Sequence, residues 1–298
     1  MKNNLQKTGW LLLALVFLGA CQKDSIVPAT QNAATNPLLN KATTTVQSLV
    51  VETAPPIQTP QYISINANIG GFYQALPAKY SSTTQKYPLM IFCHGIGELG
   101  NGSASQLPRV LRNGPPKLIN NKTFPPSFTV NGNTYSFIVI SPQFKAWPQP
   151  ADIQAVINYA IAHYRVDLTR IYLTGLSMGG GVTWSYPAAG TLYASRLAAI
   201  LPIAGAAYPE PFKTKPISET NLATWALQNQ YDPTVPSWYS VDFVKYINAY
   251  IPTPNPKAIL TLFNASGHDS WDEAYNPAFK QNNMNVYQWM LQYSRPKN

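Results

Sequence analysis

Residues 175–179 read Gly-Leu-Ser-Met-Gly, which places Ser177 between two glycines. An apolar stretch precedes this pentapeptide and a helical pattern follows it. Where a strand turns sharply into a helix, the sequence G-x-S-x-G exposes the serine hydroxyl as a nucleophile, because only small neighbours fit the strained turn. The Met178 N–H falls at the start of the helix, where the helix dipole favours an oxyanion. The pattern predicts a nucleophilic serine at residue 177, with Met178 in the oxyanion hole.

A nucleophilic serine needs a base to take its proton. In chains with this type of turn the order along the sequence is serine, acid, histidine. The chain has three histidines, His94, His163 and His268, and only His268 follows Ser177. His268 also comes directly after an apolar segment that predicts a strand, so we predict His268 as the base.

The acid that orients this base has to lie between the serine and the histidine. Four carboxylates occur there: Glu210, Glu219, Asp232 and Asp242. Asp242 falls inside a predicted helix, and Glu219 lies in a polar loop. Asp232 follows a predicted strand and precedes a proline, which is typical of a turn, but a loop at a strand end can also hold a carboxylate against a histidine. We predict Asp232 as the acid and keep Glu210 as the alternative.

The loop after an early strand should supply the second oxyanion donor. His94, Gly95 and Ile96 follow an apolar strand, and we expect the Ile96 N–H to take this role while His94 supports the loop. Residues 95–100 also match the dinucleotide-binding pattern G-x-G-x-x-G. However, residues 101–105 open no clear helix, and no acidic residue occurs between Glu98 and Asp152, so the ribose-binding acid is missing.

No metal or cofactor is indicated by the sequence. The chain contains no H-E-x-x-H motif, and its three histidines and two cysteines do not cluster. Cys93 stands beside His94, but a small apolar residue that ends a core strand explains it better than a thiol enzyme does. We therefore expect chemistry carried by protein side chains alone.

Strands and helices alternate along most of the chain. The strands are predicted at residues 63–67, 72–76, 88–93, 137–140, 171–174, 198–203, 223–227 and 258–263. Helices are predicted at residues 151–164, between 174 and 198, at 238–250 and at 285–293. The Pro- and Asn-rich residues 113–133 are expected to form a surface loop. This alternation predicts an α/β fold in which helices flank a mainly parallel sheet.

The N-terminus has the pattern of a bacterial export signal. Lys2 and Lys7 precede an apolar run from Trp10 to Ala20, which is shorter than the roughly 20 residues needed to cross a bilayer. The run ends in Leu-Gly-Ala-Cys and resembles a lipobox, so we predict a signal peptide at residues 1–20 and lipidation of Cys21. Residues 21–60 predict a polar tether, and residues 61–298 the catalytic domain. The expected location is the cell envelope, with the lipid in a membrane.

Charge and composition limit the possible partners. The chain has 298 residues with a formal net charge of +9, and 45% of them are hydrophobic, enough for one large domain. The lysines and arginines are scattered and no nucleic-acid motif occurs, which argues against a nucleic-acid partner. We expect a monomer. If Cys21 carries lipid, Cys93 has no partner for an intrachain disulfide.

Four of the motifs together resemble a known esterase group. They are residues 94–98 (His-Gly-Ile-Gly-Glu), 175–180 (Gly-Leu-Ser-Met-Gly-Gly), 232–236 (Asp-Pro-Thr-Val-Pro) and 267–271 (Gly-His-Asp-Ser-Trp). The group comprises the phospholipase/carboxylesterase-like and feruloyl-esterase-like α/β-hydrolases, which are related to polyhydroxybutyrate depolymerases. The resemblance covers roughly residues 62–298 and implies an α/β-hydrolase fold with Ser177, Asp232 and His268 as the triad. Leu99 stands where many relatives have Arg, and Gln228-Asn229 stand where many have His-Gly.

A carbohydrate-linked ester is the substrate we expect. Trp147, Trp238, Tyr239 and Trp271 lie in loops or at element starts near the expected active-site edge. Aromatic side chains there suit sugar rings or phenolic acyl groups such as feruloyl, although packing of the domain explains them equally well. We predict Trp147 and Trp271 as substrate-binding residues. A serine peptidase, a lipase and a non-catalytic glycan-binding lipoprotein are the alternatives.

Overall fold

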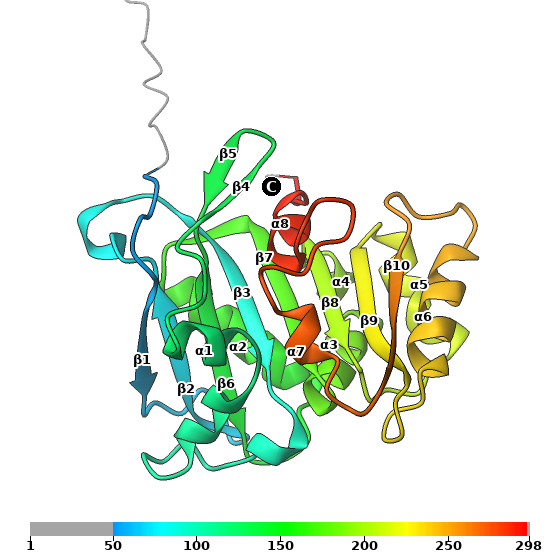
Figure 1. Ribbon diagram of the computed structural model, residues 1–298, viewed down its shortest axis with the longest axis horizontal. Coiled ribbons are helices and arrows are strands. Elements are labelled where there is room, and N and C mark those ends of the chain that lie inside the picture. The colour runs from blue at the N-terminus through cyan, green and yellow to red at the C-terminus, as the bar shows by residue number, and fades with distance from the viewer. Residues whose placement is uncertain (1–49, 297–298) are drawn as a thin grey trace, which may run out of the picture. The chain divides into compact units, whose positions relative to one another are not determined.

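The computed structural model describes residues 50–296 (Figure 1). The signal peptide, Cys21 and most of the tether predicted above lie outside these residues. The described chain builds an eight-stranded sheet in the order β1-β2-β6-β3-β7-β8-β9-β10, with a separate β4–β5 hairpin. The strands are β1 Ile57–Gln61, β2 Ile69–Leu76, β3 Tyr87–Cys93, β4 Phe128–Val130, β5 Asn133–Tyr135, β6 Ile138–Phe144, β7 Val166–Leu176, β8 Ala199–Ile203, β9 Ala223–Tyr231 and β10 Ile259–Ser266.

The central strands are buried on both faces, as their continuous apolar sequences predict. In β3, Leu89, Ile91 and Cys93 belong to the core on one face of the sheet. Met90 and Phe92, which alternate with them, belong to the core on the other face. Within the eight-stranded sheet, the pairs from β6 across to β10 are parallel, and the pairs β1–β2 and β2–β6 are antiparallel. The predicted mainly parallel α/β sheet is confirmed.

Helices cover both faces of this sheet (Figure 1). The α-helices are α1 Gly114–Asn120, α2 Pro150–His163, α3 Met178–Ala188, α4 Thr191–Ala194, α5 Pro211–Glu219, α6 Trp238–Asn248, α7 Trp271–Ala274 and α8 Val286–Leu291, and the 3₁₀ turns are η1 Tyr80–Ser82, η2 Ile96–Glu98 and η3 Leu107–Arg112. Buried side chains of α2, α3, α5 and α6 pack in one core, and those of α1, α7 and α8 pack in the other. None of the helices in residues 50–296 has the length and apolarity to cross a membrane.

Two local predictions were wrong. Residues 63–67 form no strand, although their side chains alternate; instead Ile57–Gln61 pairs with β2. Residues 113–133 are not a plain surface loop, because they contain α1 and β4 and bury Phe124 and Phe128. Both errors come from tertiary packing that overrides a local pattern.

The compact domain also begins earlier than the predicted residue 61. Glu52 is buried and accepts a hydrogen bond from the Lys79 N–H at 2.9 Å. The Val50 N–H donates to the Gln85 side chain at 2.9 Å, and Gln85 lies just before β3. Residue 50 therefore lies at the edge of the sheet where the parallel strands begin. The loops that follow the parallel strands lie at the opposite edge.

Candidate active site

Ser177 occupies a strained turn between β7 and α3. Its backbone has φ 52° and ψ −116°, a positive φ that non-glycine residues rarely adopt. A Cβ on Gly175 would lie 2.5 Å from the Gly179 carbonyl, and a Cβ on Gly179 would lie 2.0 Å from the Cys93 carbonyl oxygen. Both positions accept only glycine, as the G-x-S-x-G pattern requires.

Hydrogen bonds hold this turn in place. The Ser177 N–H donates to the Ile203 carbonyl at 3.0 Å, which ties the turn to β8. The Ser177 carbonyl accepts from Gly181 at 2.8 Å and from Ala206 at 3.0 Å. These bonds fix the backbone on both sides of the serine, so that the surrounding structure bears the strain.

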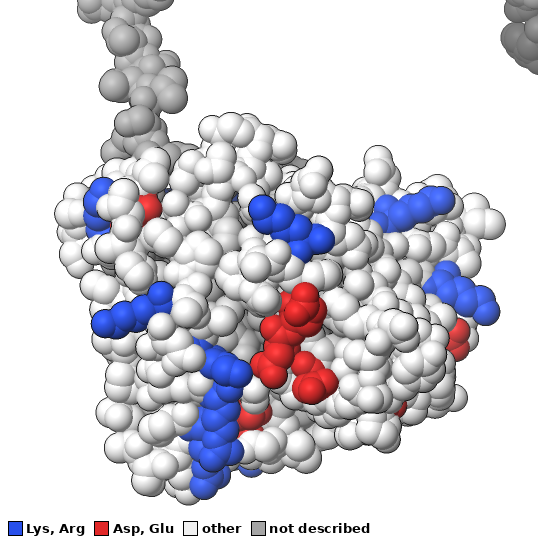
Figure 2. All heavy atoms as spheres, in the orientation of Figure 1, with Lys and Arg blue, Asp and Glu red and all other residues white. Residues whose placement is uncertain are grey.

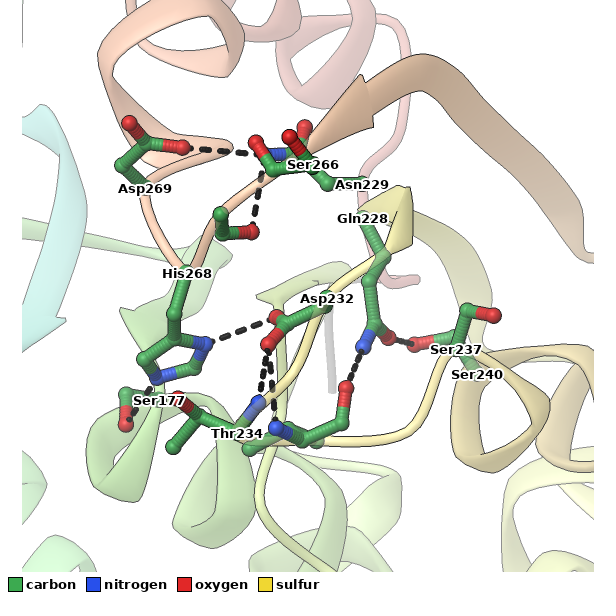
Figure 3. Close-up of polar contacts among 12 residues, drawn as sticks. Ser177, Gln228, Asn229, Asp232, Thr234, Ser237, Ser240, Ser266, His268 and Asp269 are labelled. Atoms are coloured by element: carbon green, nitrogen blue, oxygen red, sulfur yellow. Dashed lines mark hydrogen bonds and ion pairs between the residues drawn. The ribbon is translucent and has the colours of Figure 1, made fainter.

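The structure brings Ser177, His268 and Asp232 together at the carboxyl ends of β7, β10 and β9 (Figure 3). His268 Nε2 lies 2.8 Å from Ser177 Oγ, and His268 Nδ1 lies 2.7 Å from Asp232 Oδ2. The Asp232 side chain is fully buried, whereas 17% of the His268 side chain is exposed. A carboxylate at Nδ1 favours the tautomer with the proton on Nδ1, which leaves Nε2 free to accept the serine proton.

The two oxygens of Asp232 have different partners. Oδ1 accepts from the Thr234 N–H at 2.8 Å and from the Val235 N–H at 3.0 Å, which is the turn-forming role of an aspartate before proline. Oδ2 remains for His268. Glu210, the alternative acid, forms an ion pair with Lys213 at 2.5 Å at the start of α5. The arrangement therefore favours Asp232.

His94 supports the loop that faces the serine. The Phe144 N–H donates to His94 Nε2 at 3.0 Å, so Nδ1 carries the proton and donates to the Gly95 carbonyl at 2.6 Å. Burial lowers the pKa of His94 to about 4, against the opposing effect of the Gly95 bond. The imidazole is therefore neutral at pH 7 and links β6 to the loop, which is the supporting role expected from the sequence.

Two backbone amides lie next to the serine. Met178 is the first residue of α3, and Ile96 is the first residue of η2. A Cβ on Gly95 would lie 3.7 Å from Ser177 Cβ, so this loop passes directly beside the nucleophile. Among residues 50–296 neither the Met178 nor the Ile96 N–H donates to a protein acceptor. Both amides remain available for an oxygen of a bound substrate.

Polar residues that sequence reasoning missed brace this loop. Arg109 donates to the Leu99 carbonyl at 2.7 Å, and Gln143 donates to the Glu98 carbonyl at 3.0 Å. Asn113 donates to the Glu98 carboxylate at 2.8 Å, and burial raises the pKa of this carboxyl. Gln143 is a fully buried amide near the end of β6, beyond the strand predicted at residues 137–140.

The dinucleotide pattern at residues 95–100 has no phosphate-binding geometry. It forms the short turn η2 rather than the start of an α-helix, and the next α-helix begins at Gly114. The neighbouring Cys93 is fully buried, and burial raises the pKa of its thiol. Among residues 50–296 no group of three His, Cys, Asp or Glu side chains could hold a metal ion.

Trp271 lies next to the base. Its ring meets the His268 ring edge-on, with centroids 5.0 Å apart and planes at 89°. A cavity of about 250 Å³ adjoins Trp271 between α1 and α7. Its remaining lining comes from Gly114, Lys117, Leu118, Asp272, Tyr275 and Asn276. Trp271 therefore contacts the base on one side and lines this cavity on the other.

Trp147 lies farther along the same edge of the sheet. It stands in the loop between β6 and α2 with 45% of its surface exposed. Within residues 50–296 no hydrogen bond or ring contact joins it to the triad. The structure therefore brings Trp271, but not Trp147, to His268.

A second cavity, of about 980 Å³, is lined by none of the three triad residues. Asp167 and Thr169 at the beginning of β7 line it, together with Arg196 and Arg295. Ser177 follows the other end of this 11-residue strand. The larger cavity therefore opens at the edge of the sheet opposite the serine.

Comparisons with known proteins agree with this geometry. Residues 77–280 match the model of the phospholipase/carboxylesterase family. The structure resembles a thermostable esterase with 22% identity and a TM-score of 0.55, covering 81% of this chain and 64% of that one. It also resembles the feruloyl esterase module from Clostridium thermocellum complexed with sinapinate, with 16% identity and a TM-score of 0.51, covering 73% of this chain and 83% of that one.

A ferulic acid esterase is a third similar structure, with 13% identity and a TM-score of 0.51, covering 75% of this chain and 95% of that one. At these identities the structures show a shared fold. No curated protein matches the sequence. The family match, which spans most of the chain, is the finding that bears on its activity.

Proposed function

We propose that this chain, which belongs to the phospholipase/carboxylesterase family of α/β-hydrolases, is an esterase that uses Ser177 as its nucleophile. The observation that carries the proposal is the continuous hydrogen-bonded chain from Ser177 Oγ through His268 to Asp232, at 2.8 Å and 2.7 Å. Such a chain lowers the barrier for removing the serine proton, because the imidazolium that forms faces a buried carboxylate.

The proposed reaction has two halves. His268 Nε2 takes the proton from Ser177 Oγ as the oxygen attacks the ester carbonyl, and the Met178 and Ile96 amides donate to the oxyanion. The imidazolium then protonates the leaving alcohol, and an acyl group remains on Ser177. Water, deprotonated by His268, attacks this acyl-enzyme and releases the acid and the free serine.

The test is hydrolysis of p-nitrophenyl acetate, p-nitrophenyl butyrate and a feruloyl ester by the purified protein, beside Ser177→Ala. We expect Ser177→Ala to lose turnover and to keep its circular dichroism spectrum. A fluorophosphonate probe should label the unchanged protein and not the variant. Undiminished hydrolysis by folded Ser177→Ala would refute the assignment of the nucleophile.

We propose carbohydrate-linked acyl esters, of the acetyl or feruloyl type, as the substrate class. The ring contact between Trp271 and His268 supports a planar acyl group next to the base, and a cavity of about 250 Å³ adjoins Trp271. Exposed aromatic rings support a polymeric substrate. Tyr208 lies in the loop after β8, and Trp238 and Tyr239 begin α6; the three ring centroids lie 4.5 to 5.7 Å apart.

Exposure distinguishes this cluster from core packing. Tyr208 is 57% exposed and Trp238 is 43% exposed, and both follow strands whose carboxyl ends form the edge with the triad. Large rings with a polar tip contribute contact area at low entropic cost. We expect Trp238→Ala to lower the release of acyl groups from a feruloylated or acetylated polysaccharide and to leave p-nitrophenyl acetate hydrolysis unchanged.

Phe212→Ala is the matched control, because Phe212 is 67% exposed and lies outside the cluster. Equal effects of the two substitutions on polymer hydrolysis would count against a polysaccharide substrate. A substrate panel in which only long-chain lipid esters are hydrolysed would favour a lipase instead.

A lipid anchor at Cys21 is proposed from the N-terminal sequence alone. Its chemistry would place the enzyme at a membrane of the cell envelope, with the acyl chains as the membrane contact. In cells given radiolabelled palmitate, the full chain should incorporate label and Cys21→Ser should not. Labelling of Cys21→Ser would refute this anchor.

A further inference from the structure

Two consecutive amide side chains near the end of β9 are buried. Gln228 has no exposed surface and Asn229 has 3%. Successive side chains of a strand point to opposite faces of the sheet, so the two amides contact different parts of the protein. Buried amides need hydrogen-bond partners, and these partners are found on the two loops that carry Asp232 and His268 (Figure 3).

Asn229 binds the loop of the base. Its Nδ2 donates to the Gly267 carbonyl at 3.0 Å and to Asp269 Oδ1 at 2.9 Å, with a longer contact of 3.4 Å to the Ser266 carbonyl. These acceptors lie on both sides of His268. One side chain of β9 therefore holds the backbone immediately before the base and the side chain immediately after it.

The ladder between β9 and β10 is irregular at this position. Phe263 pairs with Asn229 and Ser266 pairs with Tyr231, so an additional residue of β10 is accommodated between the two pairs. Such bulges redirect a strand end and leave backbone groups unpaired. Just beyond this irregularity the Asn229 amide donates to the carbonyl of Gly267, which has a φ of +100°.

Gln228 binds the loop of the acid from the other side of β9. Its Nε2 donates to the Val235 carbonyl at 2.6 Å, and its Oε1 accepts from Ser240 Oγ at 2.6 Å. The Val235 N–H in turn donates to Asp232 Oδ1. Gln228 thus connects the Asp232 turn to α6.

We propose that Gln228 and Asn229 are positioning residues, which together set the separation and orientation of Asp232 and His268. Neither amide contacts Ser177, so each acts through the loop that it holds. The inference rests on the proposed function, because it concerns the geometry of the same triad. A displacement of about 1 Å in such a constellation lowers the rate on the order of 10²-fold.

Asn229→Asp tests the loop of the base. The substitution keeps the shape of the side chain but replaces the N–H donors by an oxygen that faces carbonyl and carboxylate oxygens. We expect kcat for p-nitrophenyl acetate to fall about 10- to 100-fold and KM to stay within about twofold, since the residue does not touch substrate. Asn264→Asp is the matched control, because it adds the same charge to β10 at an exposed position.

The imidazole proton gives a second readout. In the unchanged protein and in Asn264→Asp, the His268 Nδ1 proton, which donates to Asp232, should give a strongly downfield ¹H NMR resonance. This resonance should shift or disappear in Asn229→Asp. Unchanged kcat and an unchanged resonance in folded Asn229→Asp would overturn the proposal.

Further variants decide the question if Asn229→Asp does not fold. Asp269→Ala removes one exposed acceptor of Asn229, and Ser240→Ala removes the donor to Gln228; both should lower kcat and leave KM unchanged. Full activity of both variants would overturn the proposal. Turnover that survives Ser177→Ala would refute the proposed function itself, whereas serine-dependent turnover unaffected by these variants would refute only the positioning role.

Discussion

Acid should destabilise this protein through His94, and the size of the effect follows from its environment. The pKa of His94 is lowered by burial from 6.5 to about 4, so the unfolded chain binds a proton at a higher pH than the folded protein does. The contribution of His94 to stability is therefore fully present above pH 6.5 and is lost as the pH falls through 6.5 toward 4. One pKa unit corresponds to about 1.4 kcal/mol, so the loss amounts to about 3 kcal/mol.

The assay is equilibrium unfolding in urea at pH 7 and pH 4, for the unchanged protein and for His94→Gln. Other groups also titrate in this range, but they do so in both proteins. The difference in free energy of unfolding between the two proteins should shrink by about 3 kcal/mol from pH 7 to pH 4, because only the unchanged protein carries the buried imidazole.

His163→Gln is the matched control, because His163 is exposed at the end of α2. The difference in free energy of unfolding between His163→Gln and the unchanged protein should not shrink from pH 7 to pH 4. If the free energies of unfolding of His94→Gln and the unchanged protein differ by the same amount at both pH values, the argument is refuted. Such a result would mean that His94 does not stay neutral in the folded protein.

Three further substitutions test the site. Asp232→Asn should lower kcat about 10⁴-fold in ester hydrolysis, because an amide at this position favours the wrong tautomer of His268; an activity within tenfold of the unchanged protein would contradict the role of the acid. Gly179→Ala should lower the melting temperature, because the new Cβ would lie 2.0 Å from the Cys93 carbonyl oxygen; unaltered melting would show that the turn can relax. Trp271→Ala should lower kcat/KM more for a feruloyl ester than for an acetyl ester, and an equal decrease for both would place the acyl group elsewhere.

Burial explains why the sequence predicted the strands before Ser177 and Asp232, whereas β10, which precedes His268, has no buried residue. The strand β3, the second half of β7 and most of β9 are buried and mainly apolar, so these segments of the sequence have few other interpretations. The assignment of His268 needed only the chain order, since no other histidine follows Ser177. The structure then joins the three side chains by two hydrogen bonds.

The parts that the sequence did not predict depend on contacts between distant segments. The amide of Asn229 meets a loop 38 residues away, and that of Gln143 meets a loop 45 residues away. Neither amide lies in a motif, because its partners are mostly backbone carbonyls, which every residue type supplies. The prediction of a loop at residues 113–133 was wrong for a related reason. The prolines of this segment indicated a loop, but the rings of Phe124 and Phe128 pack against Tyr287 of the distant helix α8.

The hydrogen bond between the Val50 N–H and the Gln85 side chain fixes the side of the sheet on which residue 50 joins the domain. Val50 contacts Gln85 at the edge where the parallel strands begin, whereas Ser177 lies at the edge where they end. A chain fixed at Cys21, as we propose, reaches at most about 100 Å to Val50. A pull from such an anchor would act on the face opposite the triad.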